Sequence, residues 1–225
     1  HHHLRLCKFD FSWYLNLYMK ITKIKEDITS EIASTFKNSV AIDTEATGLQ
    51  IPERDKLSLI QLCDEKDNVY IIQPNKNNFK APHLVSVLEN EKIQKIGHFL
   101  RFDKNALEFF LKCKIKNIFD TKIASKIVRT YTDSHGLKNL VQEFCNKSLD
   151  KKQGSSDWNK DLDDLSEKQL EYAANDVVYL HKIKKELEVM LTREKRMDLY
   201  KRCLTFLDTR VELDQNGFKF DIFEH

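Results

Sequence analysis

The sequence is poor in glycine and proline, with five and three of these among its 225 residues. Disordered segments are usually enriched in both residue types, so this composition argues against extended disorder. Long apolar runs are missing as well, because the apolar stretch 11–18 is too short and too interrupted by polar residues to span a bilayer. We therefore expect a folded domain that is not anchored in a membrane.

Cysteine is sparse and follows no metal-binding pattern. The sequence has five cysteines, an odd number, and none of them forms a C-x-x-C pair. They are Cys7, Cys63, Cys113, Cys145 and Cys203. This pattern argues against a structural zinc site and against a disulfide framework, and it fits a protein of the reducing cytoplasm.

An excess of charge of one sign is also missing, because 37 basic residues oppose 35 acidic ones and leave a formal net charge of +2. The net charge therefore identifies no class of partner. Basic residues do gather at 112–129, outside the acidic stretches. Such a cluster is compatible with a phosphate-binding surface beside a metal site, and equally with an ordinary solvated face.

A chain of this length can bury a sizeable core, and no internal repeat or change of composition divides it. Residues 1–3 are three histidines that resemble the remnant of an affinity tag, and we expect the native chain to start at Met19. We therefore predict a tag or leader over 1–18 and one domain over 19–225.

Apolar periodicity predicts an α/β protein with strands first and helices mainly later. Residues 40–42, 57–63 and 69–72 are predicted to form an antiparallel meander, and 92–96 a further short strand. Helices are predicted at 21–36, 82–89, 100–112, 120–129, 136–146, 166–190 and in a last segment that runs to about Leu213. We expect these helices on both faces of a mixed sheet.

Two of the predicted helices carry a capping signal at their start. Asp120 is a suitable N-cap, and Ser166 with Gln169 has the spacing of a capping box. Between these helices lies the polar stretch 147–164, which we expect to be a loop held by local anchors such as Trp158.

The apolar run 40–42 is followed at once by Asp43 and Glu45, and then by Gly48. This order is typical of a buried strand that runs into a turn. Because side chains i and i+2 of a strand point to the same face, the two carboxylates are expected to project together. Neighbouring carboxylates repel each other unless a cation lies between them, and oxygen ligands suit Mg²⁺ or Mn²⁺. The pair is a candidate metal site, although the same pattern also occurs in solvated turns.

Two later segments offer further carboxylates. Asp103 falls in the first turn of a predicted helix, where the helix dipole by itself favours a negative charge. Tyr172 and Asp176 lie one turn apart on the same face of a later helix, a spacing that is also common by chance. Each signal is weak alone, so their value depends on the combination.

In this order, Asp43 with Glu45, then Asp103, then Tyr172 with Asp176 resemble the three motifs of the DEDD-type 3′-to-5′ exonucleases, in the tyrosine variant. Further segments are similar to RNase D, namely 40–45, 59–62, 98–103, 119–121, 149–158 and 171–180. The segments 209–213 and 221–223 resemble the short, single-domain bacterial members. The resemblance covers about 19–225, and no segment resembles the helical nucleic-acid-binding domains of full-length RNase D.

The resemblance implies an RNase H-like fold, in which a mixed sheet is flanked by helices on both faces. It implies that Asp43, Glu45, Asp103 and Asp176 bind two divalent cations, Mg²⁺ or Mn²⁺, which stabilise the attacking and leaving oxygens. Tyr172 is then expected to orient the attacking water, because a phenol with a pKa near ~10 is a poor base at neutral pH. The implied reaction is hydrolysis at the single-stranded 3′ end of RNA, with DNA as a second candidate, and it releases nucleoside 5′-monophosphates.

The same resemblance implies that Thr47, Gly48 and Leu49 contact the terminal nucleotide, with Leu49 stacked against the bases. His98 and Phe102 are candidates to line the same pocket, and core packing is the alternative for both. Lys138 and Lys151 are candidates for contacts with the phosphate groups of the substrate.

Two positions differ from patterns found among DEDD proteins, and other functions remain as alternatives. Many DEDD proteins have asparagine four residues before the second-motif aspartate, where this chain has Phe99, but RNase D-like proteins often lack it. The histidine variant needs histidine five residues before Asp176, where this chain has Glu171. The remaining alternatives are a non-catalytic nucleic-acid-binding scaffold that retains the exonuclease fold and a structural domain whose acids match the motifs by coincidence. The sequence indicates no oligomeric state.

Overall fold

The computed structural model describes residues 19–150, residue 154 and residues 156–225. Their strands form one six-stranded sheet in the order β1-β4-β3-β2-β5-β6. The central strands β2, β3 and β4 pair antiparallel, which confirms the predicted meander, whereas β1, β5 and β6 pair parallel with their neighbours. The strands are β1 Lys20–Lys25, β2 Ser39–Ala46, β3 Leu57–Cys63, β4 Asn68–Gln73, β5 Gln94–Gly97 and β6 Ile118–Asp120.

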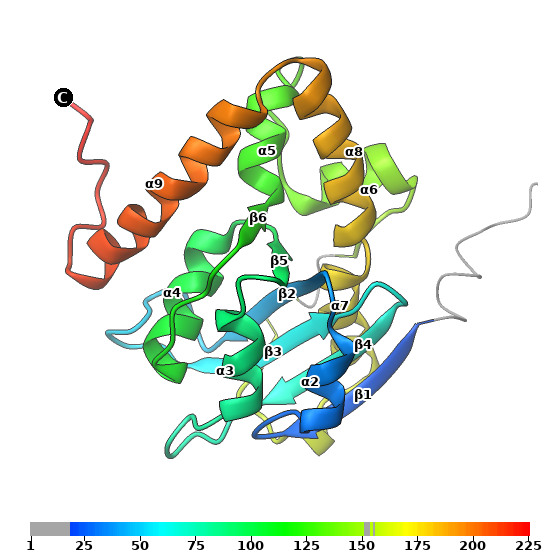
Figure 1. Ribbon diagram of the computed structural model, residues 1–225. Helices are drawn as coiled ribbons and strands as arrows, with labels where there is room; N and C mark the ends of the chain where they lie inside the picture. Colours follow the sequence, from blue (N-terminus) through cyan, green and yellow to red (C-terminus); the bar gives the residue numbers. More distant parts are fainter. Residues whose placement is uncertain (1–18, 151–153, 155) are drawn as a thin grey trace, which may run out of the picture.

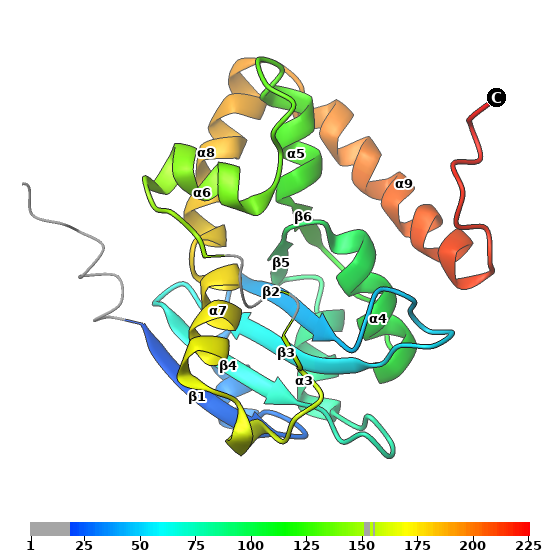
Figure 2. The ribbon, with the colours of Figure 1, turned by 180° about the vertical axis from the view of Figure 1, so that it is seen from behind.

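Helices cover both faces of this mixed sheet, as predicted. α7 lies on one face, whereas α3 and α4 lie on the other, and α5, α6 and α8 gather beyond β6 (Figures 1 and 2). The helices are α2 Ser30–Thr35, α3 Pro82–Glu89, α4 Leu100–Leu111, α5 Thr121–Val128, α6 Leu137–Cys145, α7 Glu167–Val178, α8 Leu180–Arg193 and α9 Met197–Gln215, with a 3₁₀ turn at Leu162–Asp164.

Alternate residues of the strands enter two apolar clusters, one on each face of the sheet. On β2, Ala41 belongs to the cluster that includes α7, whereas Val40 and Ile42 belong to the cluster that includes α3 and α4. Because side chains alternate along a strand, Asp43 and Glu45 share the face of Ala41. The two carboxylates therefore point to the side of the sheet that α7 covers.

The helix predicted over 21–36 is wrong. Lys20–Lys25 forms the edge strand β1, paired parallel with β4, and only Ser30–Thr35 of the predicted range is helical. β-branched residues such as Ile21 and Ile24 fit a pleated surface. The backbone of β1 finds its hydrogen-bond partners in a strand more than 40 residues away in sequence. Local apolar spacing carries no information on such a partner.

The helix predicted over 166–190 is two helices, because α7 ends at Val178 and α8 begins at Leu180. Strand β6 was not among the predicted elements. With three residues, it is too short to produce a periodic pattern of its own.

Both capping predictions are confirmed. The Asp120 carboxylate accepts hydrogen bonds from the backbone N–H groups of Lys122 and Ile123, and Ser166 forms a capping box with Gln169. Trp158 is buried, as expected of an anchor for its loop. In the described part of the chain, no helix combines the length and the apolarity that crossing a membrane requires.

Candidate active site

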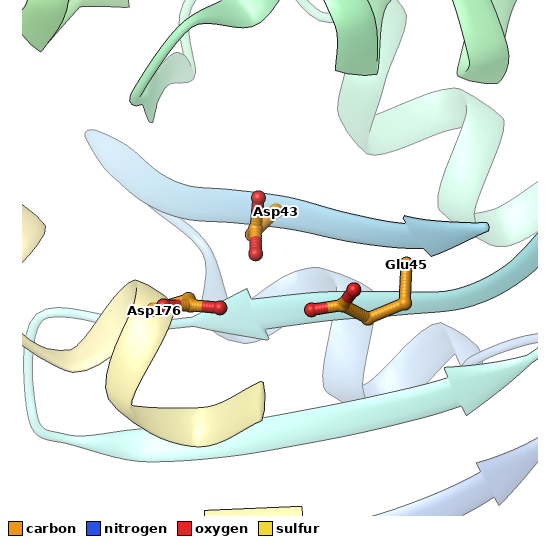
Figure 3. A group of neighbouring side chains, drawn as sticks. All are labelled: Asp43, Glu45 and Asp176. Atoms are coloured by element: carbon orange, nitrogen blue, oxygen red, sulfur yellow. The ribbon is translucent and has the colours of Figure 1, made fainter. Parts of the chain in front are cut away.

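Three carboxylates meet on the α7 face of the sheet. Asp43 and Glu45 project from β2, and Asp176 projects from the facing turn of α7. One carboxylate oxygen of each residue lies within 4.8 Å of the others. Figure 3 shows the three side chains directed toward a common space. The i, i+2 spacing on β2 and the position on α7 therefore bring together three of the four carboxylates in the predicted site.

Asp103 approaches this cluster from another element, the first turn of α4. The pairing of β2 with β5 ends at Ala41, so the start of α4 lies beside the second half of β2. There the Thr44 hydroxyl donates a hydrogen bond of 2.5 Å to Asp103 Oδ1. Asp103 is not part of the group within 4.8 Å, but it is close enough to raise the pKa of Asp43.

Burial and mutual repulsion oppose ionisation of these acids. Burial, followed by repulsion from Asp103, raises the pKa of Asp43 well above its ordinary value. Burial and then Asp176 raise the pKa of Glu45 to about 9. The pKa of Asp103 rises to about 7, mainly through burial, although the hydrogen bond from Thr44 opposes this rise. An all-oxygen cluster with these properties fits divalent cations, because their charge would relieve the repulsion.

Gln61 ties together the elements that supply the cluster. Its side chain is fully buried on β3, and its amide nitrogen donates to Asp43 Oδ2 at 3.2 Å and to the carbonyl oxygen of Ala173 at 3.4 Å. Gln61 also lowers the pKa of Glu45 through a hydrogen bond. One amide thus joins β3 to the acidic strand β2 and to α7, one turn before Asp176.

Tyr172 lies on α7 one turn before Asp176, with its ring 6.0 Å from that of the buried Trp158. Burial and the nearby carboxylates, Asp176 first among them, raise the pKa of its phenol. Tyr172 therefore stays protonated at neutral pH. The phenol can position a water molecule by hydrogen bonding, but it is a poor proton acceptor.

A cavity of about 310 Å³ adjoins the carboxylates, and both Tyr172 and Asp176 line it. His98 and Lys138 are among its other lining residues. The ring of His98 lies 2.8 Å, Nδ1 to Oγ1, from Thr121. The structure thus places His98 beside the predicted tyrosine and aspartate.

The remaining candidates for substrate contacts are dispersed. Thr47, Gly48 and Leu49 follow β2 directly, and the Leu49 side chain is 85% exposed. Phe102 is half-buried and packs against the apolar cluster on the α3 and α4 face. Lys151 lies outside the described residues.

Sequence reasoning did not assign roles to Gln61 or Asp55. Gln61 was recognised only as part of a family segment, and its signal is a polar residue in the middle of a wholly buried strand. Asp55 is buried in the loop after β2, where it accepts a hydrogen bond from Thr47. Its signal was weaker, because charged residues are ordinary in a polar loop.

Comparison with known proteins shows which family this chain belongs to. The chain matches the model of a 3′-5′ exonuclease family over residues 7–192. The chain belongs to this family. Its resemblance to RNase D-like DEDD exonucleases is thereby confirmed, whereas the tyrosine variant stays a prediction.

Two proteins with similar sequences are much longer than this chain. The chain is 32% identical to ribonuclease D of Bartonella henselae over 183 residues, which are 80% of the chain and 44% of the relative. It is 29% identical to DNA polymerase I of Aquifex aeolicus in an alignment of 210 positions that covers 81% of the chain and 32% of that protein. The chain thus spans less than half the length of these curated relatives.

Two solved structures of a similar protein match over all or nearly all of their chains. The structure of Brucella melitensis NrnC with bound Mg²⁺ is 42% identical, with a TM-score of 0.85, over 92% of this chain and 100% of that one. A structure of the same protein bound to pGG matches equally well, over 99% of its chain. Escherichia coli RNase D shares the fold, with a TM-score of 0.75 at 24% identity over 86% of this chain and 51% of that one.

Proposed function

We propose that this domain is a metal-dependent 3′-to-5′ exonuclease that hydrolyses phosphodiester bonds at single-stranded 3′ ends of RNA and releases nucleoside 5′-monophosphates. DNA is the second candidate substrate. This proposal rests on the convergence of Asp43, Glu45 and Asp176 within 4.8 Å, in a chain that belongs to the exonuclease family. We predict that these three residues and Asp103 hold two divalent cations, Mg²⁺ or Mn²⁺.

Each side chain has a definite task in this proposal. When bound, the cations would acidify the attacking water and neutralise charge on the leaving oxygen. Tyr172 keeps its proton, since burial and Asp176 raise its pKa, and it orients the water for in-line attack. Thr44 and Gln61 hold Asp103 and Asp43 by hydrogen bonds, so the carboxylates need little rearrangement.

The decisive test is cleavage of a 5′-labelled single-stranded RNA with Mg²⁺ or Mn²⁺, compared with a chelator. We expect a metal-dependent ladder that shortens from the 3′ end. Asp176→Asn should lower the rate about 10²- to 10³-fold, because it removes several kcal/mol of transition-state stabilisation. Glu171→Gln is the matched control, since it neutralises an exposed acid on the same helix.

No cleavage by the wild type with either metal would favour the alternative, a non-catalytic nucleic-acid-binding scaffold. Equal activity of wild type and Asp176→Asn would remove the carboxylate cluster from the mechanism. A parallel assay with single-stranded DNA of the same sequence measures the preference for RNA.

Short oligonucleotides are a more specific candidate substrate. The NrnC structure with pGG supports this proposal, because the match extends over almost all of that protein. In this chain, the cavity beside Tyr172 and Asp176 is also lined by Lys122 and Lys138, which can attract phosphate. We expect a higher kcat/KM for pGG than for a 20-nucleotide RNA, and an equal or lower value would contradict this substrate class.

A further inference from the structure

The loop after β2 presents an apolar side chain to solvent. Leu49 is 85% exposed, whereas Ile51 and Asp55 in the same loop are buried. A single exposed leucine needs no explanation by itself. Here, however, it follows the strand that carries Asp43 and Glu45, and it lies in a loop held together by its own hydrogen bonds.

A buried carboxylate closes this loop. Asp55 Oδ1 accepts a hydrogen bond from the Thr47 hydroxyl at 3.2 Å, and Oδ2 accepts one from the backbone N–H of Gln50 at 2.9 Å. The Arg54 guanidinium contacts the same carboxylate at 3.1 Å. Thr47 and Gln50 flank Leu49 on both sides. Asp55 therefore binds the Thr47 side chain on one side of the exposed leucine and the Gln50 backbone on the other.

Gly48 is required by the close approach of this carboxylate. A Cβ atom at position 48 would lie 2.5 to 2.7 Å from the three carboxyl atoms of Asp55, closer than real Cβ contacts. The loop thus has room for the Asp55 carboxylate only because residue 48 lacks a side chain. The two residues thus pack closely against each other, and Gly48 directly precedes Leu49 in the chain.

Contacts from outside hold the remainder of the loop. The Lys219 ammonium lies 2.7 Å from the Glu53 carboxylate, and the Asn105 amide donates to the carbonyl oxygen of Ile51 at 3.4 Å. Hydrogen bonds to Asp55 thus hold the loop internally, and contacts with α4 and the C-terminal segment attach it to the rest of the protein. Such bracing reduces the ordering cost of binding a ligand at its tip.

We propose that Asp55 is the positioning residue for the 3′-terminal nucleotide, because its buried carboxylate holds Thr47, Gly48 and Leu49 in the conformation that receives the terminal base. The inference rests on the proposed function and adds a residue to it. Asp55 acts through the loop and contacts no reacting atom. Its loss should therefore weaken substrate binding rather than slow the chemical step.

The test compares the steady-state kinetics of wild type and Asp55→Asn on a 5′-labelled single-stranded RNA. Asparagine has nearly the same shape as aspartate, but its NH₂ group replaces one of the two oxygens that accept hydrogen bonds. We expect KM to rise about 10-fold or more, with kcat changed less than about threefold, since a hydrogen bond to a charged group is lost. The affinity for Mn²⁺, measured by titration calorimetry, should stay within about twofold of wild type.

Asp64→Asn is the matched control. Asp64 is also buried and closes the β3–β4 turn by accepting backbone hydrogen bonds from Lys66 and Asn68, at the opposite end of the β2–β3 pair. Its substitution should lower the melting temperature without changing KM. If Asp55→Asn lowers the melting temperature in the same way and leaves KM unchanged, Asp55 is merely structural and the inference is wrong.

A double-mutant cycle tests the packing of Gly48 against Asp55. Gly48→Ala should raise KM about 10-fold in the wild-type background, where the new methyl group meets the carboxylate. In an Asp55→Ala background the same substitution should have an effect at least about threefold smaller, because the obstructing group is gone. Additive effects would contradict the proposed coupling.

RNA binding distinguishes failure of this inference from failure of the proposed function. Fluorescence anisotropy of a labelled RNA with Ca²⁺ in place of Mg²⁺ gives a Kd without requiring cleavage. If the wild type binds but does not cleave, the proposed function fails, and a weaker Kd for Asp55→Asn still supports the loop inference. If the wild type binds no RNA, both are overturned.

Discussion

At the scale of single residues, the candidate site consists of acids that repel one another and neutral groups that hold them in place. Asp43 and Glu45 have raised pKa values, caused first by burial and then by neighbouring acids. Gln61 and Thr44 counter this with hydrogen bonds to Asp43 and Asp103. Because metal ligands depend on such outer contacts for their orientation, the neutral groups should affect cation affinity.

Gln61→Leu tests this dependence. Leucine retains much of the buried volume but donates nothing to Asp43 or Ala173, so the spacing between β2 and α7 is no longer fixed by a hydrogen bond. We expect about 10-fold weaker Mn²⁺ binding by titration calorimetry. Ser58→Ala is the control, because it removes a buried hydroxyl without a hydrogen-bond partner from the same strand. Equal affinity in wild type and Gln61→Leu would exclude this role.

At the scale of elements, the short strand β5 decides where α4 begins, and α4 carries Asp103. Lys95 in β5 is fully buried, and its ammonium donates to the carbonyl oxygens of Asn90 at 2.8 Å and Ile93 at 2.6 Å. Burial lowers its pKa to about 8. The turn before β5 is thus held by a buried cation that titrates near neutral pH.

This shift predicts a pH dependence of stability. Between about pH 8 and the ordinary lysine pKa of 10.5, the unfolded chain holds a proton on Lys95 that the folded chain has lost. The free energy of unfolding should therefore rise with pH in this range, by roughly 2 to 3 kcal/mol for this residue alone. Urea unfolding of wild type and Lys95→Met from pH 7.5 to 10.5 isolates the contribution. A constant difference between the two proteins would contradict the shifted pKa.

At the scale of the whole molecule, cation binding should be linked to folding. The cluster joins β2 to α7, and Asp103 adds α4, so elements from both faces of the sheet meet at one site. Cations that bind only the folded chain stabilise it by mass action, by about 2.7 kcal/mol when the free cation is at 100 times its Kd. A chelator should remove this gain completely.

The gain should also depend on pH. In the metal-free protein the pKa values of Glu45, about 9, and Asp103, about 7, lie above those of the unfolded chain. The folded state then binds more protons on these two acids, so their contribution to stability falls as pH rises from about 4 through 9. Cations bind the ionised carboxylates, so their affinity rises over the same range. Thermal unfolding with Mn²⁺ and with chelator should show a larger difference at pH 8 than at pH 6, and the reverse order would refute the linkage.

Local patterns in the sequence were sufficient for part of the fold and the site. Strand alternation places Asp43 and Glu45 on one face, and the capping box at Ser166 marks the start of α7, because both depend on residues close in sequence. The same holds for the antiparallel meander, whose β3–β4 turn is short. The ordered motifs also led to the exonuclease family to which the chain belongs.

Other features of the fold and the site depend on partners that are distant in sequence, so local patterns could not predict them. Pairing with β4 makes Lys20–Lys25 a strand despite its helix-like spacing. Gln61 meets Ala173 across 112 residues, and Lys219 meets Glu53 across 166. Asp55 is nearer in sequence to Thr47, but its burial depends on how the whole loop folds back on itself. Local sequence patterns were thus enough to select the acids of the candidate site, whereas contacts between distant segments establish which residues hold those acids and the neighbouring loop in place.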